Sequence, residues 1–168
     1  MFGSAFLRTA LHEPLARILS EMKNRRLINP AEIVAEVRSI YDELENRPVE
    51  RNCLRRTECC QFKLTGRTPY LTMGEALVAA KALRATGRTR LPKRIDGICP
   101  LLGDDGRCVI YADRPFGCRT HFCAAAGGPY ARQEVTDLIH RLEDIDCQLG
   151  GDGSRPILAA VQDTLAKL

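Results

Sequence analysis

The chain has 168 residues and a mass of 18.7 kDa, enough for one compact domain with its own hydrophobic core and too little for two large ones. Hydrophobic residues make up 45% and charged residues 27%, and no apolar run approaches the roughly 18 residues of a membrane span, so the composition indicates a soluble protein. The net charge of +4 is uneven, since residues 47–94 carry twelve Lys or Arg against three acids.

The first part of the chain is predicted to contain two helices. Apolar residues at helical spacing predict a helix over about residues 13–25, because Pro14 is tolerated in a first turn. Asn29 and Pro30 have the pattern of an N-cap and a first-turn proline, and the apolar stripe after them predicts a second helix that ends near residue 46. The first segment has neither a compact apolar run nor a small-residue cleavage site, so we expect a cytoplasmic protein.

The middle of the chain is predicted to hold one helix between irregular segments. Residues 48–68 show no clear period, which is typical of a loop whose shape depends on what its cysteines hold. Thr72 and Glu75 have capping-box spacing, the residues up to position 85 are strong helix formers, and Gly87 can close the helix. Residues 88–94 follow as a basic connector.

The last part of the chain predicts a turn and two further helices. Residues 104–107, Asp-Asp-Gly-Arg, are a turn signal, so the segment from Cys99 to Cys108 is expected to form either a short hairpin or a knuckle-like loop. Apolar residues between positions 135 and 149 predict a helix that ends at a Gly-Gly pair. A last short helix begins near residue 157, with Ser154 as its candidate cap.

Eight cysteines are the strongest functional signal, and seven of them lie between residues 53 and 123. In a reducing cytoplasm, clustered thiols more often bind metal than form disulfides. Because a helical stretch without cysteines separates the two cysteine-rich segments, the fold is expected to bring them together around a metal centre. We therefore expect a single mainly α domain over residues 1–168. Four to five helices would surround an irregular metal-binding core at 53–123, with helical flanks at 1–46 and 129–168.

The cysteine segments resemble a known family. Cys99-Pro-Leu-Leu, Gly106-Arg-Cys-Val-Ile-Tyr, Arg114-Pro and Cys118-Arg, preceded by the run from Cys53 to Cys60, are similar to the cysteine-cluster family described as zinc- or iron-chelating (YkgJ-like). That family's signature is C-x2-C-x2-C-C, then C-P-x-L, then C-x-I-Y-x2-R-P-x2-C-R. The downstream half matches throughout, whereas Arg56 stands where the upstream half has its second cysteine.

The resemblance implies metal or cluster binding, in a structural or redox module. The same motif occurs in the flagellin lysine N-methylases, which are associated with an iron–sulfur cluster. A metal- or cluster-dependent enzyme, such as a protein lysine methylase, is therefore the alternative function. Methyl transfer would rest on analogy alone, because a shared site does not fix the substrate.

The candidate ligands are thiols. The preferred set is Cys59, Cys60, Cys99, Cys108 and Cys118, followed by Cys53 and then Cys123. Four thiolates satisfy either a tetrahedral zinc ion or a 4Fe–4S cluster. Six or seven thiols with few histidines favour the cluster, because a single zinc would leave two or three thiols without a metal. A zinc or iron ion, or two metals with bridging thiolates, are the alternatives.

Other side chains near the motif are expected to support the ligands. From the resemblance, Tyr111, Arg114 and Arg119 would surround them, with the two arginines donating hydrogen bonds to thiolates or carbonyls. His121 is the histidine that merits a mutation, whereas Cys147 is expected to lie outside the site and to pack beside the apolar face of its helix. Cations also offset thiolate charge, and the chain has no Trp to stack on bases, so we expect a protein or small-molecule partner in preference to nucleic acid, and no membrane.

Overall fold

The computed structural model describes residues 29–48, 51, 53–54, 56–94 and 96–168, so the predicted helix at 13–25 lies outside the described residues. The described chain is mainly helical, as the sequence predicts. Its longer helices are α2 (Pro30–Glu45), α4 (Met73–Ala85), α6 (Thr136–Gln148) and α7 (Ile157–Leu165). One-turn helices α3 (Phe62–Thr65) and α5 (Phe116–Arg119) and strands β1 (Tyr70–Leu71) and β2 (Arg155–Pro156) complete the named elements, beside short 3-10 turns. None of the described helices is long and apolar enough to cross a membrane.

The beginnings of α2 and α4 follow the capping signals in the sequence. The Asn29 side chain accepts a hydrogen bond from the backbone N–H of Ala31 at 2.9 Å, and Pro30 occupies the first turn of α2. The Thr72 hydroxyl accepts from the Glu75 N–H, while the Glu75 carboxylate accepts from the Thr72 N–H at 3.1 Å. These pairs confirm the predicted N-cap and capping box.

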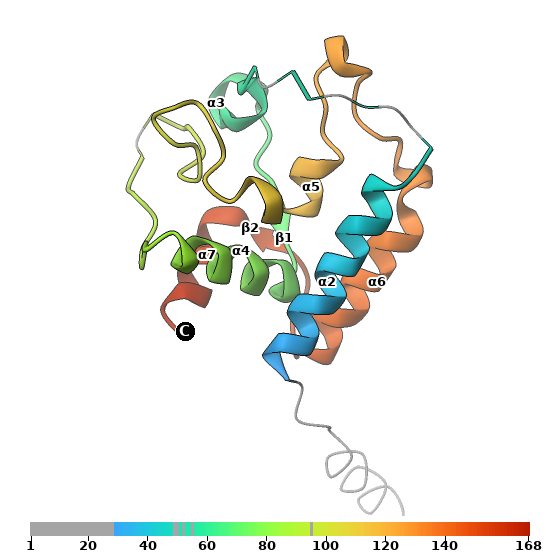
Figure 1. Ribbon diagram of the computed structural model, residues 1–168, viewed down its shortest axis with the longest axis vertical. Helices are drawn as coiled ribbons and strands as arrows, with labels where there is room; N and C mark the ends of the chain where they lie inside the picture. Colours follow the sequence, from blue (N-terminus) through green and yellow to red (C-terminus); the bar gives the residue numbers. More distant parts are fainter. Residues whose placement is uncertain (1–28, 49–50, 52, 55, 95) are drawn as a thin grey trace, which may run out of the picture.

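Helix α4 lies at the centre of the fold and separates two hydrophobic clusters. Figure 1 shows α2 and α6 alongside each other on one flank of the molecule, with α4 and α7 beside them. Val78 of α4 faces α2 and α6, in a cluster with residues such as Ile40, Leu138 and Leu142. The opposite face of α4 packs against α7 in a second cluster, whose members include Leu71, Ala79, Ala80, Leu83, Cys99, Leu101, Ile110, Ile157 and Val161. The second cluster therefore continues directly into the cysteine segments.

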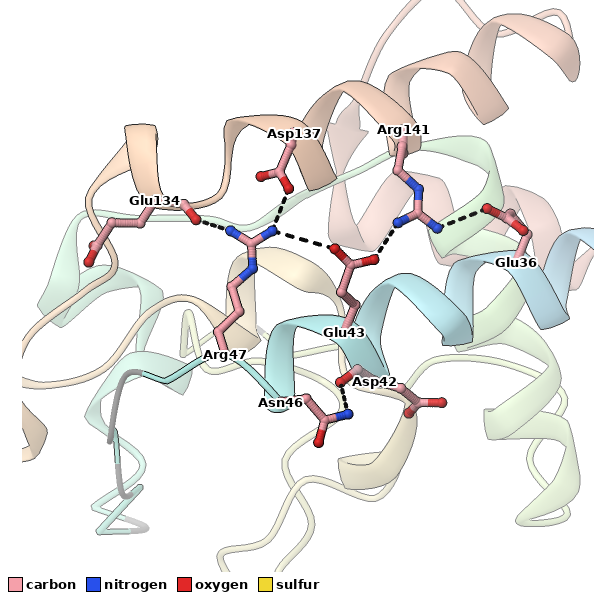
Figure 2. Close-up of polar contacts among 8 residues, drawn as sticks. All are labelled: Glu36, Asp42, Glu43, Asn46, Arg47, Glu134, Asp137 and Arg141. Atoms are coloured by element: carbon pink, nitrogen blue, oxygen red, sulfur yellow. Dashed lines mark hydrogen bonds and ion pairs between the residues drawn. The ribbon is translucent and has the colours of Figure 1, made fainter.

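Ion pairs fasten α6 to α2 on the solvent side (Figure 2). The Arg141 guanidinium lies 3.1 Å from the Glu36 carboxylate and 2.5 Å from that of Glu43. Arg47, just beyond α2, pairs with Asp137 at 2.5 Å and donates to the backbone carbonyl of Glu134. Exposed pairs of this kind each contribute little, so the apolar contacts between the helices provide most of the stability.

The connection between α6 and α7 differs from the prediction. Ser154 does not cap α7: Pro156 is the residue before the helix, and no side chain caps it. The preceding residues instead form β2, which pairs antiparallel with β1, and the Ile157 N–H donates to the Pro69 carbonyl at 2.9 Å. Strand pairing between distant segments satisfies the backbone here, so the cap that the local sequence suggests is not used.

Candidate functional site

The two cysteine-rich segments lie next to each other, joined by backbone hydrogen bonds. The Cys99 N–H donates to the Cys60 carbonyl at 2.7 Å, and the Phe62 N–H donates to the Gly97 carbonyl at 2.9 Å. These bonds flank an isolated antiparallel bridge between Gln61 and Ile98. The backbone alone therefore brings the upstream thiols beside Cys99, although about forty residues separate them in sequence.

The predicted turn after Cys99 is present. The Gly103 N–H donates to the Arg107 carbonyl at 2.8 Å, and Leu102 forms an antiparallel bridge with Cys108. Gly106 has a φ of +72°, a left-handed conformation that a glycine adopts without strain. The turn reverses the chain, so Cys99 and Cys108 stand at the two ends of one short loop.

Cys118 lies on α5, and Arg119 beside it fixes the loop that precedes this helix. Only 4% of Arg119 is exposed. Its guanidinium donates to the backbone carbonyl of Arg114 at 2.9 Å and to that of Ala112, pairs with the Glu45 carboxylate, and lies 4.3 Å from the centre of the Tyr41 ring. The arginine thus binds carbonyls, one of the two roles expected for it, and holds residues 112–114 against α2.

Six cysteines from these segments line one cavity of about 460 Å³. They are Cys53, Cys59, Cys60, Cys99, Cys108 and Cys118. Its other walls include apolar residues such as Phe62 and Leu101 and the polar residues Thr57, Thr65, Arg67, Tyr70, Arg107, Tyr111, Arg114 and His121. The thiols surround this space, and among the described residues no three His, Cys, Asp or Glu side chains are assembled as a ready metal-ligand set. All eight cysteines of the chain are free thiols.

The cavity controls the acidity of its thiols mainly by burial. Burial raises the pKa of Cys99 to about 11 and also raises the pKa values of Cys108 and Cys118. The sulfur atoms of Cys59 and Cys60 lie 4.0 Å apart and share a hydrogen bond, which lowers the pKa of Cys59 and raises that of Cys60. Burial therefore favours the neutral thiol at Cys99, Cys108 and Cys118, whereas Cys59 is the more acidic member of its pair.

Cationic side chains face the same cavity. The Arg114 guanidinium lies 4.5 Å from the centre of the Tyr111 ring, and its charge also acts on the thiols of Cys59 and Cys108. Also on the cavity wall, a guanidinium nitrogen of Arg67 is 3.3 Å from Nδ1 of His121. Burial, followed by the charge of Arg67, lowers the pKa of His121.

The remaining candidates lie away from the cavity. Cys123 is not among the lining residues and instead precedes the 3-10 helix Ala124–Ala126. Cys147 is exposed on α6, outside the cavity, as expected, although it does not pack into the core. Part of the basic connector, residues 88–94, lines a separate groove of about 1,100 Å³.

Glu75, predicted only as part of the capping box of α4, has a second role behind the site. Its side chain is 3% exposed, and besides capping α4 it accepts a hydrogen bond from the Phe116 N–H at 2.8 Å and one from the Tyr41 hydroxyl at 3.4 Å. Glu75 therefore links α4, α2 and the first amide of α5, the helix that carries Cys118. Capping-box spacing was the signal for this residue, and nothing local could indicate its contacts with α2 and α5.

No family model matches the chain, and no curated protein or solved structure matches it significantly.

Proposed function

We propose that the cavity binds a thiolate-ligated metal centre and that this protein is a metal-binding cysteine-cluster module with a structural or redox role. The observation that carries the proposal is the gathering of six of the eight cysteines, from three separated segments, around one cavity. Thiols buried only as packing groups have no reason to gather in this way. The similarity of residues 53–123 to a zinc- or iron-chelating family supports the same conclusion.

The donor set fits soft or borderline metals. The ligands of the centre would come from Cys59, Cys60, Cys99, Cys108 and Cys118, with Cys53, and thiolates are the ligands of iron–sulfur clusters and of many zinc sites. One zinc ion and one 4Fe–4S cluster each use four thiolates, but zinc sites commonly include histidine, whereas the described residues of this cavity offer six thiols and a single histidine, so we infer an iron–sulfur cluster in preference to zinc. A reducing cytoplasm, in which we propose the protein resides, would keep these thiols free of disulfides.

Metal binding would also stabilise the fold at this end of the molecule. Among the described residues, the segments that carry the thiols are loops and single helical turns, and few backbone hydrogen bonds join them. Because burial raises the pKa values of Cys99, Cys108 and Cys118, neutral thiols would have to lose protons when a metal binds. The free energy of metal binding is then part of the free energy of folding.

A metal- or cluster-dependent enzyme, such as a protein lysine methylase, is the second candidate. The observation in its favour is the size and lining of the cavity, whose volume of about 460 Å³ falls in the range of small-molecule sites and whose walls carry Tyr111, Arg114 and His121 beside the thiols. An enzyme of this kind needs an open coordination position, whereas a structural site is closed. Imidazole or cyanide would change the absorption spectrum of an open site and leave a closed one unaffected.

Metal and sulfide analysis, with an absorption spectrum, tests the proposal on protein purified without oxygen. We expect brown protein with several irons and matching sulfide per chain. Colourless protein with about one or two zinc ions would keep the thiolate site and reject the cluster. Protein that holds no stoichiometric metal, with all eight thiols reacting rapidly with an alkylating reagent, would reject metal binding itself.

A further inference from the structure

Basic side chains line the cavity beside the thiols. Arg67, Arg107, Arg114 and His121 line it, and no Asp or Glu is among the described residues of its wall. The arginines come from different segments: Arg67 follows α3, Arg107 lies in the turn before Cys108, and Arg114 precedes α5. Three guanidinium groups without a lining carboxylate attract an anion into the space that they enclose.

Arg114 is the best placed of these side chains. Its guanidinium carbon lies over the Tyr111 ring, 4.5 Å from the ring centre, and both residues line the cavity. Its Nε is buried and has no hydrogen-bond partner among the described residues. A buried donor without a partner is uncommon, but this nitrogen has almost no accessible surface, so a ligand in the cavity would be held by the other nitrogens of the guanidinium.

A metal centre alone does not use up this charge. A zinc ion or a 4Fe–4S core of charge +2 uses four of the six lining thiols, and this centre carries a charge of about −2 when the other two thiols are neutral. The three arginines that line the cavity contribute three positive charges, so about one positive charge is left over. The volume of about 460 Å³ also falls in the range of small-molecule sites.

We propose that a small oxyanion, a carboxylate or phosphoryl group, binds in this cavity beside the metal centre, held mainly by Arg114 and assisted by Arg67 and Arg107. The inference rests on the proposed function, since it places the anion next to thiolate-bound metal. The planar fork of a guanidinium matches the two oxygens of a carboxylate or phosphate, which a single-point cation does not. Binding of this kind would make the cavity a site for a small anionic substrate or effector.

The test uses metal-loaded protein purified without oxygen. Inorganic phosphate and acetate are titrated separately by calorimetry and by thermal melting, at ionic strength held constant with chloride. We expect saturable binding of at least one of the two, which raises the melting temperature. Phosphate and acetate distinguish a phosphoryl ligand from a carboxylate ligand.

Two substitutions and a matched control assign the site. Arg114→Gln and Arg67→Gln each remove a cation from the wall, and we expect Arg114→Gln to weaken binding about tenfold or more. Arg67→Gln keeps the test valid if Arg114→Gln fails to fold. Arg84→Gln removes an exposed cation of α4 outside the cavity and should leave binding unchanged.

Two results would overturn the inference. One is that metal-loaded protein binds neither anion at millimolar concentration. The other is that the Arg114 and Arg67 variants bind as the wild type does, so that the arginines only offset thiolate charge. The metal content of the same sample separates this failure from that of the proposed function, because protein that holds no metal rejects the proposed function and this inference with it.

Discussion

Replacing Glu75 by Gln tests whether the buried carboxylate behind the cavity holds the site together. One carboxylate oxygen accepts from the Phe116 N–H at 2.8 Å and from the Tyr41 hydroxyl, and the other accepts from the N–H and hydroxyl of Thr72. The substitution keeps the size of the side chain but turns one of these two acceptors into an amide donor.

The loss of stability in Glu75→Gln depends on which of the four hydrogen-bond donors can reorient. The hydroxyl groups of Tyr41 and Thr72 can rotate and accept from the new amide, but a backbone N–H cannot. Either the Phe116 or the Thr72 amide is therefore left buried without an acceptor, which costs about 1–3 kcal/mol. We expect Glu75→Gln to lower the free energy of unfolding by about this amount near pH 7, where the carboxylate is ionised, measured by urea denaturation.

The pH dependence gives the prediction a sign. Burial raises the pKa of Glu75 above its usual value of 4.5, although the four hydrogen bonds act against the shift. The folded protein therefore holds this proton to higher pH than the unfolded chain, and the stability that the proton contributes is lost as pH rises through the folded-state pKa. The difference in unfolding free energy between wild type and Glu75→Gln should therefore shrink as the pH increases.

Glu143→Gln, an exposed substitution on α6, is the matched control and should show no comparable change. A Glu75→Gln variant as stable as the wild type at every pH would refute the network. A difference in stability that grows with pH would refute the raised pKa instead. Other titratable or charged groups near Glu75 are the Tyr41 hydroxyl, Arg119 and Cys118. The comparison of unfolding free energies should therefore stay within the pH range in which carboxyl groups titrate.

Three further predictions concern the metal centre and the core. Cys108→Ser and Cys118→Ser should each lower both the metal content and the melting temperature. Cys147→Ser replaces an exposed thiol outside the cavity and should change neither quantity. Full metal content in the Cys108 and Cys118 variants would contradict their assignment as ligands. Asp146→Ala should lower the free energy of unfolding, measured in urea, by about 1–3 kcal/mol. The buried Asp146 carboxylate accepts hydrogen bonds from the Met73 N–H, the first amide of α4, at 2.7 Å and from the Gly153 N–H at 3.0 Å. An unchanged free energy of unfolding would contradict this role. Leu138→Ala should cost about 2–5 kcal/mol in the same assay, since this side chain is fully buried between α6 and α2, and a loss below about 1 kcal/mol would contradict that packing.

The helix ends could be predicted because their signals are local. Asn29 with Pro30, Thr72 with Glu75, and Gly87 after α4 each act within one or two turns of the chain, and the structure has all three as expected. Gly87 has a φ of +81°, and its N–H donates to a carbonyl of the last turn of α4, as a closing glycine does.

Contacts between segments distant in sequence could not be predicted from such local signals. Ser154 has the chemistry of an N-cap, but pairing of β2 with β1 decides how α7 begins. The sequence predicted Glu75 only as part of a capping box and gave no role for Asp146, because their partners on other elements cannot be inferred from helical spacing. A buried acid becomes recognisable only when the fold shows what donates to it.

For the candidate site, spacing predicted the gathering and the structure supplied the geometry. Cys99 and Cys60 lie side by side, as expected from two cysteine segments that must meet, and six of the seven candidate thiols line one cavity. Cys123 does not line it, because α5 and the turn after it lead the chain away before that residue. Arg114 was expected near the ligands, whereas its unpaired Nε and the absence of acids among the described lining residues needed the structure.

X-ray absorption spectroscopy of the metal that the protein holds when purified without oxygen tests thiolate ligation most directly. The predicted result is a first shell of sulfur atoms, at about 2.3 Å if the metal is zinc, together with iron neighbours if it is a cluster. A first shell of nitrogen and oxygen atoms alone, at about 2.0–2.2 Å, or no metal edge at all, would contradict a centre held by the thiols of Cys99, Cys108 and Cys118.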